Sequence, residues 1–376
     1  MILDSYRRLV KFIKKFLGTF ILILNALALI VLLLAAFSDY ISPFRAVFFS
    51  YLGLFFPFIF LFNFTLFLFW LFAKKWKFAG LNVFVFLICI SSILTYFPIH
   101  PKTKDIPEDC IKILTYNVMR FGKPNAKTKE EPNQILQYIR DVDADIVCLQ
   151  EYGFFTNNPK ALMKEINFVL EKYPYSNIEK LKLTHSEIYG NVIFSKFPIL
   201  SEQKAPYESY AYDGSIVYEL DIKGKKVTLV NNHLESNKLS QEDKNDYYQM
   251  IEEPDSRSLD VFTKMMTKRL TPAYRQRAIQ AQIISKIIEE TKNPYIIVCG
   301  DFNDTPISYT RHKIKGNLRD AFVDSGCGLG ITYNQHRFFF RIDYILHSNN
   351  IKSYNCTVGK VRTSDHYPVW CYLQLK

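Results

Sequence analysis

Acidic and amide side chains follow directly after short apolar runs, at the points where strands would end. Asn117 follows the run 111–114, and Glu151 follows the run 146–149. A hard cation such as Mg²⁺ prefers carboxylate and carbonyl oxygens as ligands. Asn117 and Glu151 are therefore candidate metal ligands, although an isolated Asn at a strand end is more often a turn residue.

The sharpest local motif is Gly300-Asp301-Phe302-Asn303, which follows the apolar run 295–298. Gly300 allows a tight turn, and Asp301 and Asn303 point the same way if the backbone is extended. A carboxylate in this position can take a proton from water while the amide holds a phosphate oxygen. The alternative is an Asx turn or a helix cap without chemistry.

Two histidines occur in comparable positions. His233 follows the run 226–230, and His366 lies in Ser-Asp-His just before the last apolar run. Imidazole can donate to a phosphate oxygen or protonate a departing group. Asp343 can fix the tautomer of His366, and Asp365 can face the metal. The alternatives are a structural histidine at a strand end and a polar turn before the terminal strand.

Taken in order, these motifs resemble the signature of the endonuclease/exonuclease/phosphatase superfamily: Asn, Gln-Glu, His, Gly-Asp-x-Asn, Asp and Ser-Asp-His. The resemblance covers residues 111–375. It implies a DNase I-like fold, a four-layered α/β sandwich of two mixed β-sheets flanked by helices, with the active site at one sheet edge. The chain resembles a membrane-anchored bacterial member of this superfamily.

The resemblance also implies residue roles for an Mg²⁺-dependent phosphodiesterase or phosphomonoesterase, with Mn²⁺ as an alternative metal. The expected substrate is a nucleic acid, a phospholipid or a small phosphate ester. A catalytically silent membrane scaffold or binding protein on the same fold is the alternative. The implied metal ligands are Glu151, Asn117 and Asp365, and the implied catalytic residues are Asp301 (water), Asn303 (phosphate), His233 and His366 (phosphate charge or leaving group) and Asp343 (orienting His366).

The elements that must position these residues are short strands rich in β-branched and aromatic side chains, separated by helical patterns. This mixture predicts a layered α/β domain over residues 105–376. The highly charged segment 235–271 has no strand signal and is interpreted as an insertion or lid. Strands are expected at 111–116, 146–149, 192–194, 216–220, 226–230, 295–298, 342–346 and 369–373, and helices at 132–140 and 272–291, each with Pro in its first turn.

Residues 1–104 have a different composition and predict a membrane anchor. Three uncharged apolar runs, at about 16–37, 47–72 and 78–97, each approach the roughly 20 residues that a helix needs to cross a bilayer. Buried helices of a soluble domain and a cleaved signal peptide are the alternatives. The length and number of the runs favour three retained transmembrane helices.

The basic residues predict the orientation of these helices. Five Lys and Arg lie between positions 7 and 15 and three between 74 and 77, whereas the loop 38–46 holds only Arg45. Because cytoplasmic loops carry an excess of Lys and Arg, the N-terminus and the loop near 75 are expected in the cytoplasm. A multi-pass protein of the cell membrane then has its catalytic domain outside the cytoplasm, in the periplasm of a bacterium.

The net charge of +11 is mostly part of this topology signal. Residues 1–104 hold 11 of the 47 basic residues and 2 of the 36 acidic ones, so 36 basic and 34 acidic residues remain. The net charge of this domain is near zero, which does not indicate a groove that binds a polyanion. Seven cysteines lack zinc-site spacing, and four of them are candidates for disulfides outside the cytoplasm: Cys110, Cys327, Cys356 and Cys371.

Overall fold

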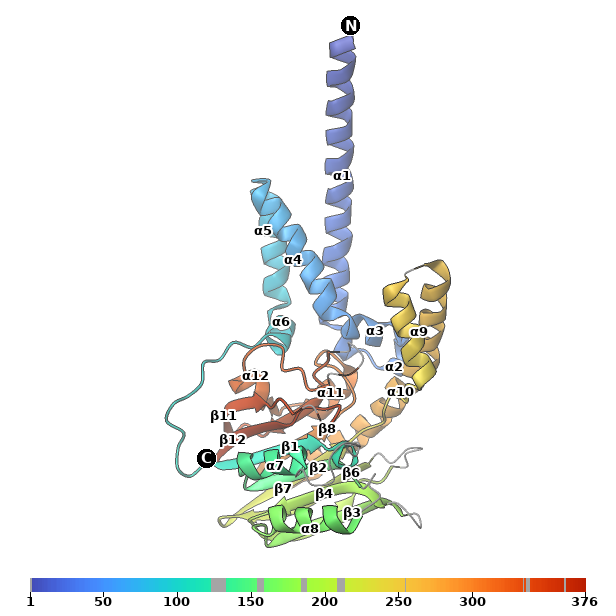
Figure 1. Ribbon diagram of the computed structural model, residues 1–376. Coiled ribbons are helices and arrows are strands. Elements are labelled where there is room, and N and C mark those ends of the chain that lie inside the picture. The colour runs from blue at the N-terminus through green and yellow to red at the C-terminus, as the bar shows by residue number, and fades with distance from the viewer. Residues whose placement is uncertain are drawn as a thin grey trace.

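The computed structural model describes residues 2–122, 133–153, 159–183, 188–207, 214–253, 255–333, 335, 339–361 and 363–376. An α-helical segment at the N-terminus leads into a domain that contains two β-sheets (Figure 1). The helices of the first segment are α1 (Ile2–Ala36), α2 (Pro43–Ala46), α3 (Phe48–Leu54), α4 (Phe56–Phe72), α5 (Trp76–Ile88) and α6 (Ile90–Tyr96), with a 3₁₀ turn η1 (Ser38–Tyr40) after α1.

Helix α1 is long and apolar enough to cross a membrane by itself, over Ser5–Ala36. The other two expected spans are not single helices. The chain bends by 64° between α3 and α4 and by 71° between α5 and α6, so three spans result only if each bent pair counts as one. Pro57, in the first turn of α4, explains the first bend because proline favours a helix start and cannot continue a preceding helix.

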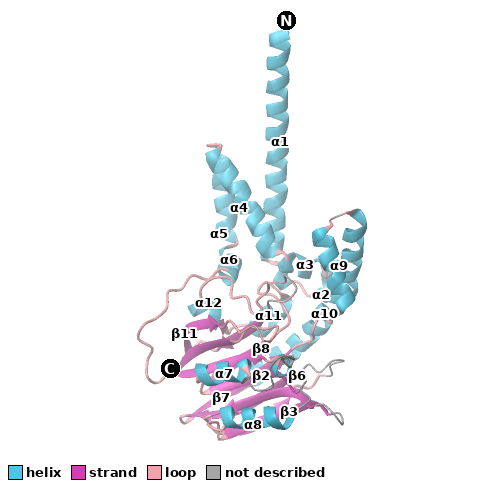
Figure 2. Ribbon diagram, viewed as in Figure 1, coloured by secondary structure: helices cyan, strands magenta, loops and turns pink. Residues whose placement is uncertain are grey.

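The rest of the described chain contains two six-stranded sheets, whose strands are magenta in Figure 2, and six α-helices. Both sheets are mixed, because β1 pairs in parallel with β2 and β7 with β8, while the other pairs are antiparallel. The first sheet has the order β11 (Ile351–Val358), β12 (Val369–Leu375), β1 (Ile111–Asn117), β2 (Ile146–Gly153), β4 (Ile188–Ser195), β3 (Tyr175–Leu183). The second has the order β5 (Ile199–Lys204), β6 (Gly214–Ile222), β7 (Lys225–His233), β8 (Tyr295–Asp301), β10 (Asp343–His347), β9 (Arg319–Asp320).

Apolar side chains fill three interfaces between four layers. One core lies between the sheets, where Ile113 and Cys148 of the first sheet face Leu229 and Cys299 of the second. The outer face of the first sheet packs on α7 (Gln134–Val142) and α8 (Pro159–Leu170), and that of the second on α10 (Ser256–Glu290) and α11 (Tyr309–Lys315). A short helix, α12 (Ala321–Ser325), packs near β11, and a 3₁₀ turn, η2 (Met119–Phe121), follows β1. The expected four-layered α/β sandwich is confirmed.

All eight expected strands are present, but the helices differ from expectation in one respect. The helix expected at 272–291 begins earlier, at Ser256, and contains Pro272 in its interior. Asp255 and Ser258 form a capping box that starts it, and this local signal lies in the segment interpreted as an insertion. The charged segment is thus α9 (Gln241–Glu252) and the first half of α10. Pro132, expected to start a helix, lies outside the described residues.

The helical segment packs tightly on the domain of the two sheets. Tyr51 of α3 shares a hydrogen bond of 2.8 Å with Thr271 of α10, and Asp39 lies 3.1 Å from Nδ1 of His312. A Cβ atom at Gly53 would lie 2.1 Å from the carbonyl oxygen of Ile307, so only glycine fits there. The domain of the two sheets therefore lies against the end of the helices where α1 ends and α4 begins (Figure 1).

All seven cysteines are free, so the four candidates for disulfides are not joined. Cys356 and Cys371 are buried in the core between the sheets, and Cys327 is exposed. Cys148 and Cys299, which precede acidic motifs, are buried thiols.

Candidate active site

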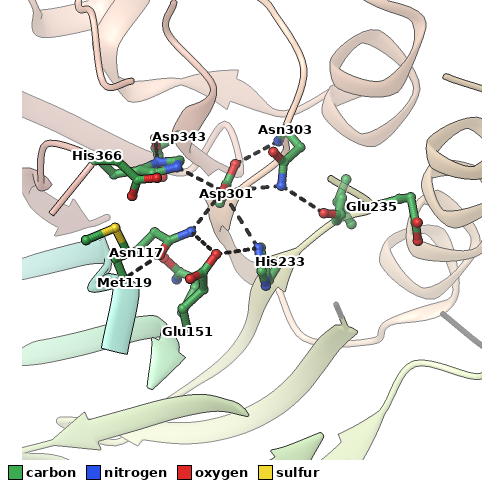
Figure 3. A network of polar contacts seen from close by, with 12 residues as sticks. Asn117, Met119, Glu151, His233, Glu235, Asp301, Asn303, Asp343 and His366 are labelled. Carbon is green, nitrogen blue, oxygen red and sulfur yellow. Dashed lines mark hydrogen bonds and ion pairs between the residues drawn. The ribbon is translucent and has the colours of Figure 1, made fainter. Parts of the chain in front are cut away.

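The ends of five strands, three of them in the second sheet, bring the predicted side chains to one edge of the sandwich. In the second sheet Asp301 of β8 pairs with His233 of parallel β7 and with Asp343 of antiparallel β10, so these three lie side by side. In the first sheet Asn117 of β1 pairs with Gln150 of β2, one residue before Glu151. The same ends of the two sheets therefore face one another across the site (Figure 3).

Glu151 reaches the site through an irregularity in β2. The pairing of β2 with β4 shifts register between Leu149 and Tyr152, and Glu151 has a positive φ of 52°. A bulge of this kind turns a side chain to a new direction, and non-glycine residues adopt this backbone only when their surroundings hold them. Gln150 points into the core, where its Nε2 donates hydrogen bonds to Oδ1 of Asn231 at 2.7 Å and to the hydroxyl of Thr115 at 3.0 Å. This buried network supports the bulge.

Asp301 lies at the centre of the polar network in Figure 3. Its Oδ2 accepts from Nδ2 of Asn117 at 3.1 Å and lies 3.6 Å from Nε2 of His366 and 3.9 Å from Nε2 of His233. Its side chain is fully buried, and this burial raises the pKa of Asp301 to about 6, although the His366 imidazole opposes the rise. A carboxylate with such a pKa is suited to exchange a proton near neutral pH.

The backbone after Asp301 forms the Asx turn that was the alternative interpretation of this motif. Oδ1 of Asp301 accepts from the N–H of Asn303 at 2.8 Å, and Asn303 has a φ of 52°. Nδ2 of Asn303 donates to the carbonyl oxygen of Leu234 at 2.9 Å. Gly300 has a φ of 120°, and a Cβ there would lie 2.0 Å from the carbonyl oxygen of Asn232. The turn therefore fixes two candidate catalytic side chains at once.

His366 and Asp343 form the expected pair. Nδ1 of His366 lies 2.9 Å from Oδ2 of Asp343, which leaves Nε2 directed toward Asp301. Burial alone would lower the pKa of His366, but the carboxylates of Asp343 and Asp301 outweigh burial and raise it well above its usual value. The imidazole is thus held protonated near neutral pH, ready to donate to an oxygen that gains negative charge.

Six of the eight predicted residues line a cavity of about 500 Å³. The other two, Asn117 and Asp343, are buried behind them. Nδ2 of Asn117 donates to Glu151 as well as to Asp301, and its Oδ1 accepts from the N–H of Met119. In this orientation the amide holds two carboxylates in place. The six residues that line the cavity are Glu151, His233, Asp301, Asn303, Asp365 and His366.

The donor set fits a hard divalent cation. Glu151, Asp301 and Asp365 present carboxylates to the cavity, and Oδ1 of Asp343 is buried without a hydrogen bond. Among the described residues, the ligand atoms of Asp301, Asp343 and His366 also lie within 4.8 Å of one another. We favour the cavity-facing carboxylates as ligands, because Nδ1 of His366 is engaged with Asp343. One protonated imidazole leaves the four carboxylates with excess negative charge, and a divalent cation would offset most of it.

Several supporting residues were not chosen as site residues from the sequence. The hydroxyl of Thr332 accepts from the N–H of Asp343 at 3.1 Å, and the hydroxyl of Ser364 donates to the carbonyl oxygen of Asn117 at 2.8 Å. The ring of Tyr333 packs edge-on against His366 with centroids 5.2 Å apart. Ser364 lies in the Ser-Asp-His motif, which was the available signal, and Thr332 and Tyr333 lie upstream of the segment that carries Asp343.

Arg277 gave no signal in the sequence, because it occurs in a helical pattern with other charged residues. It is almost completely buried and binds Asp304 at 3.3 Å and the carbonyl oxygen of Glu235 at 2.8 Å. It thereby ties α10 to the turn that carries Asp301 and Asn303.

Comparison with solved structures finds distant similarities in the catalytic domain. An endonuclease/exonuclease/phosphatase from Bacteroides vulgatus is 18% identical, with 71% of this chain and 99% of that chain covered and a TM-score of 0.49. The human Nocturnin catalytic domain with bound sulfate is 18% identical, with 72% and 96% covered and a TM-score of 0.49. D. rerio TDP2 complexed with a single-strand DNA product is 14% identical, with 71% and 99% covered and a TM-score of 0.49.

The comparison of sequences is more specific. No curated protein matches the chain. Residues 15–96 match a domain of unknown function (DUF8431), which coincides with the helical segment. Residues 114–366, from the middle of β1 to His366, match the Endonuclease/Exonuclease/phosphatase family, and this span includes every predicted site residue. Because the match covers most of the chain, the protein belongs to the Endonuclease/Exonuclease/phosphatase family.

Proposed function

We propose that this protein is a membrane-anchored, divalent-metal-dependent phosphoester hydrolase. The convergence of the eight predicted side chains on one end of the sandwich carries the proposal, since they come from segments up to 249 residues apart between Asn117 and His366. Family membership supports it independently. A silent scaffold has no need for a buried Asp301 with a raised pKa beside a protonated imidazole.

The residues of the chain divide the work of hydrolysis as follows. Asp301 orients the attacking water and accepts its proton. Asn303 and His233 hold oxygens of the phosphate group. His366, kept protonated by Asp343, stabilises negative charge and gives its proton to the leaving oxygen. Asn117 fixes the carboxylates of Glu151 and Asp301 relative to one another.

Mg²⁺, or Mn²⁺ in its place, would be held by Glu151 and Asp365, with Asn117 nearby. When bound, the cation polarises the phosphate and offsets the negative charge that develops during displacement. Its carboxylate ligands match the oxygen preference of both ions.

The membrane anchor is proposed from the surface of the helical segment. Large apolar side chains are exposed on α1, α4 and α5, among them Phe20, Leu61 and Phe84, each more than half exposed. Water would make such a surface an aggregation site, whereas lipid would cover it. Both basic clusters lie at the end of the helices far from the catalytic domain (Figure 1). We therefore propose a multi-pass anchor with the catalytic domain on the extracytoplasmic side.

The test is hydrolysis of bis(p-nitrophenyl) phosphate and p-nitrophenyl phosphate by the purified full chain in detergent. We expect activity with Mg²⁺ or Mn²⁺ and its loss with EDTA. Asp301→Asn and Glu151→Gln should each lower kcat/KM by about 10³-fold or more, whereas Asp141→Asn, at an exposed ion pair, should not. Metal-stimulated hydrolysis that persists in Asp301→Asn, or no hydrolysis in the intact protein, would refute the proposal.

A further inference from the structure

The catalytic cavity is much larger than a phosphate group and changes character along its length. Glu151, Asp301 and His366 line it, while most of the remaining lining residues are apolar or aromatic. Its volume of about 500 Å³ lies within the range of cavities that hold whole small molecules. An apolar group that remains attached to the reacting phosphate would fill the rest of the cavity.

One apolar wall comes from the α9–α10 hairpin. Met250 and Ile251 of α9 and Met265 and Met266 of α10 line the cavity. Methionine side chains are flexible and polarisable, so they adapt to chains of irregular shape. The hairpin rises from the sandwich on the same side as the membrane helices (Figure 1).

The opposite wall belongs to the membrane segment itself. Leu54, Phe55 and Phe58, at the bend between α3 and α4, line the same cavity as the catalytic residues. Phe58 is 63% exposed, and the exposed apolar surface of α4 continues from it through Leu61 and Phe62. The apolar part of the cavity is therefore continuous with the surface that the proposed bilayer covers.

The charges around the cavity do not favour a long polyanion. Among the described lining residues, the Lys and Arg side chains are Lys238 and Arg277. Lys238 pairs with Glu235, and Arg277 is buried against Asp304. Nucleic acid binding draws on Lys and Arg that contact successive phosphates. This cavity instead combines the acidic and histidine side chains of the site with a mostly apolar lining.

We propose that the substrate is a membrane lipid whose phosphate ester lies at the catalytic end and whose hydrocarbon tail lies between the α9–α10 hairpin and the α3–α4 bend. The lipid enters from the bilayer along α4. Water adds to phosphorus, the bond from phosphorus to the leaving oxygen breaks, Asp301 takes the water proton, and His366 gives a proton to the leaving oxygen. This inference rests on the proposed hydrolase function.

The experiment compares two soluble diesters with the same leaving group, methyl p-nitrophenyl phosphate and octyl p-nitrophenyl phosphate, below the micelle-forming concentration of the octyl ester. The full chain is assayed in one detergent with Mg²⁺. Each buried methylene strengthens binding by up to about fourfold, so we expect kcat/KM to be at least about 10-fold higher for the octyl ester. Partition of the octyl ester into detergent micelles works against this result, which makes a positive result stronger.

Two matched substitutions locate the tail. Ile251 lines the cavity and is 38% exposed, whereas Ile279 lies on α10 away from it and is 39% exposed. Ile251→Asp should lower the octyl-to-methyl ratio of kcat/KM at least about threefold, because a carboxylate would face the tail. Ile279→Asp should leave the ratio unchanged. Thermal unfolding of both variants checks that each is folded.

The outcomes separate this inference from the proposed function. Hydrolysis of the methyl ester with an octyl-to-methyl ratio below about 10 overturns the lipid tail but keeps the hydrolase. Equal effects of the two substitutions overturn the position of the tail. A higher kcat/KM for a single-stranded DNA oligonucleotide than for the octyl ester overturns the substrate class. Hydrolysis of neither ester refutes the hydrolase itself.

Discussion

Burial gives Asp301 and His366 protonation behaviour that neither residue has in water. Both lie almost completely out of solvent, and Nε2 of His366 lies 3.6 Å from Oδ2 of Asp301. Burial raises the pKa of Asp301 to about 6, and the neighbouring carboxylates raise that of His366 well above its usual value. At pH 7 the pair is therefore an ionised carboxylate beside an imidazolium, one group to accept a proton and one to donate it.

The pH dependence of activity should follow from Asp301. Only the ionised carboxylate accepts a proton from water, so kcat/KM should rise as pH rises through the pKa of Asp301. The midpoint is expected at or below about 6, because a bound cation favours the ionised form. The measurement is kcat/KM for bis(p-nitrophenyl) phosphate between pH 4.5 and 9 at saturating Mg²⁺. An activity that falls steadily from pH 5 to 7 would contradict this role.

Asp343→Asn should shift the alkaline limb of the pH profile of kcat/KM, where activity falls as pH rises. Asp343 is the strongest of the neighbours that raise the pKa of His366, so its loss lowers that pKa. The protonated imidazole is then lost at lower pH, and the falling limb of kcat/KM shifts toward acid, with a loss of about 10- to 100-fold at pH 8. Nitrogen NMR of His366 reports the same shift without an activity assay. Asp141→Asn is the control, and an unmoved limb would exclude Asp343 as the positioning residue for His366.

The close contact between the ends of β7 and β8 is the part of the site where a substitution is least tolerated. Gly300 lies so close to Asn232 that a Cβ atom would meet backbone at 2.0 Å, and its φ of 120° excludes most other residues. Gly300→Ala should lower the free energy of unfolding by at least about 2 kcal/mol, because the clash adds to the backbone strain. It should also lower activity, since Asp301 follows directly.

Gly224→Ala is the matched control for this prediction. Gly224 also has a positive φ, of 83°, but an added Cβ there would have nothing within 4 Å. Gly224→Ala should therefore lower the free energy of unfolding by about 1 kcal/mol, which is the cost of the positive φ alone. Thermal unfolding of both variants in the same detergent measures the difference. Equal destabilisation by the two substitutions would show that the contact with Asn232 has no consequence.

At the scale of the molecule, the proposed topology makes Cys327 a reporter. Cys327 is exposed on the catalytic domain, whereas Lys75 lies in the turn between α4 and α5 at the far end of the helices (Figure 1). In sealed right-side-out vesicles a membrane-impermeant maleimide should label Cys327, and Cys327→Ser should abolish most of the label. Lys75→Cys, made in the Cys327→Ser chain, should be labelled only after the vesicles are opened. The reverse pattern would place the catalytic domain in the cytoplasm.

The sequence by itself determined the interior strands of both sheets and the residues at their ends. Interior strands are covered on both faces, so their sequences are apolar runs. The polar residue that follows each run is therefore easy to recognise. The four strands that were not predicted, β3, β5, β9 and β11, are the four edges of the two sheets. An edge strand faces water along one side, and β5 is mostly exposed, so the apolar pattern is missing there.

Only the tertiary structure decided how these elements meet. The bulge that turns Glu151 depends on hydrogen bonds from Gln150 to Thr115 and Asn231, which lie far from it in the chain. The sequence also could not distinguish the residues that face the cavity from Asn117 and Asp343 behind them. A local stretch of sequence indicates which residues of one strand or helix are buried. A site built from two sheets, the α9–α10 hairpin and the N-terminal helical segment forms only once these elements pack together.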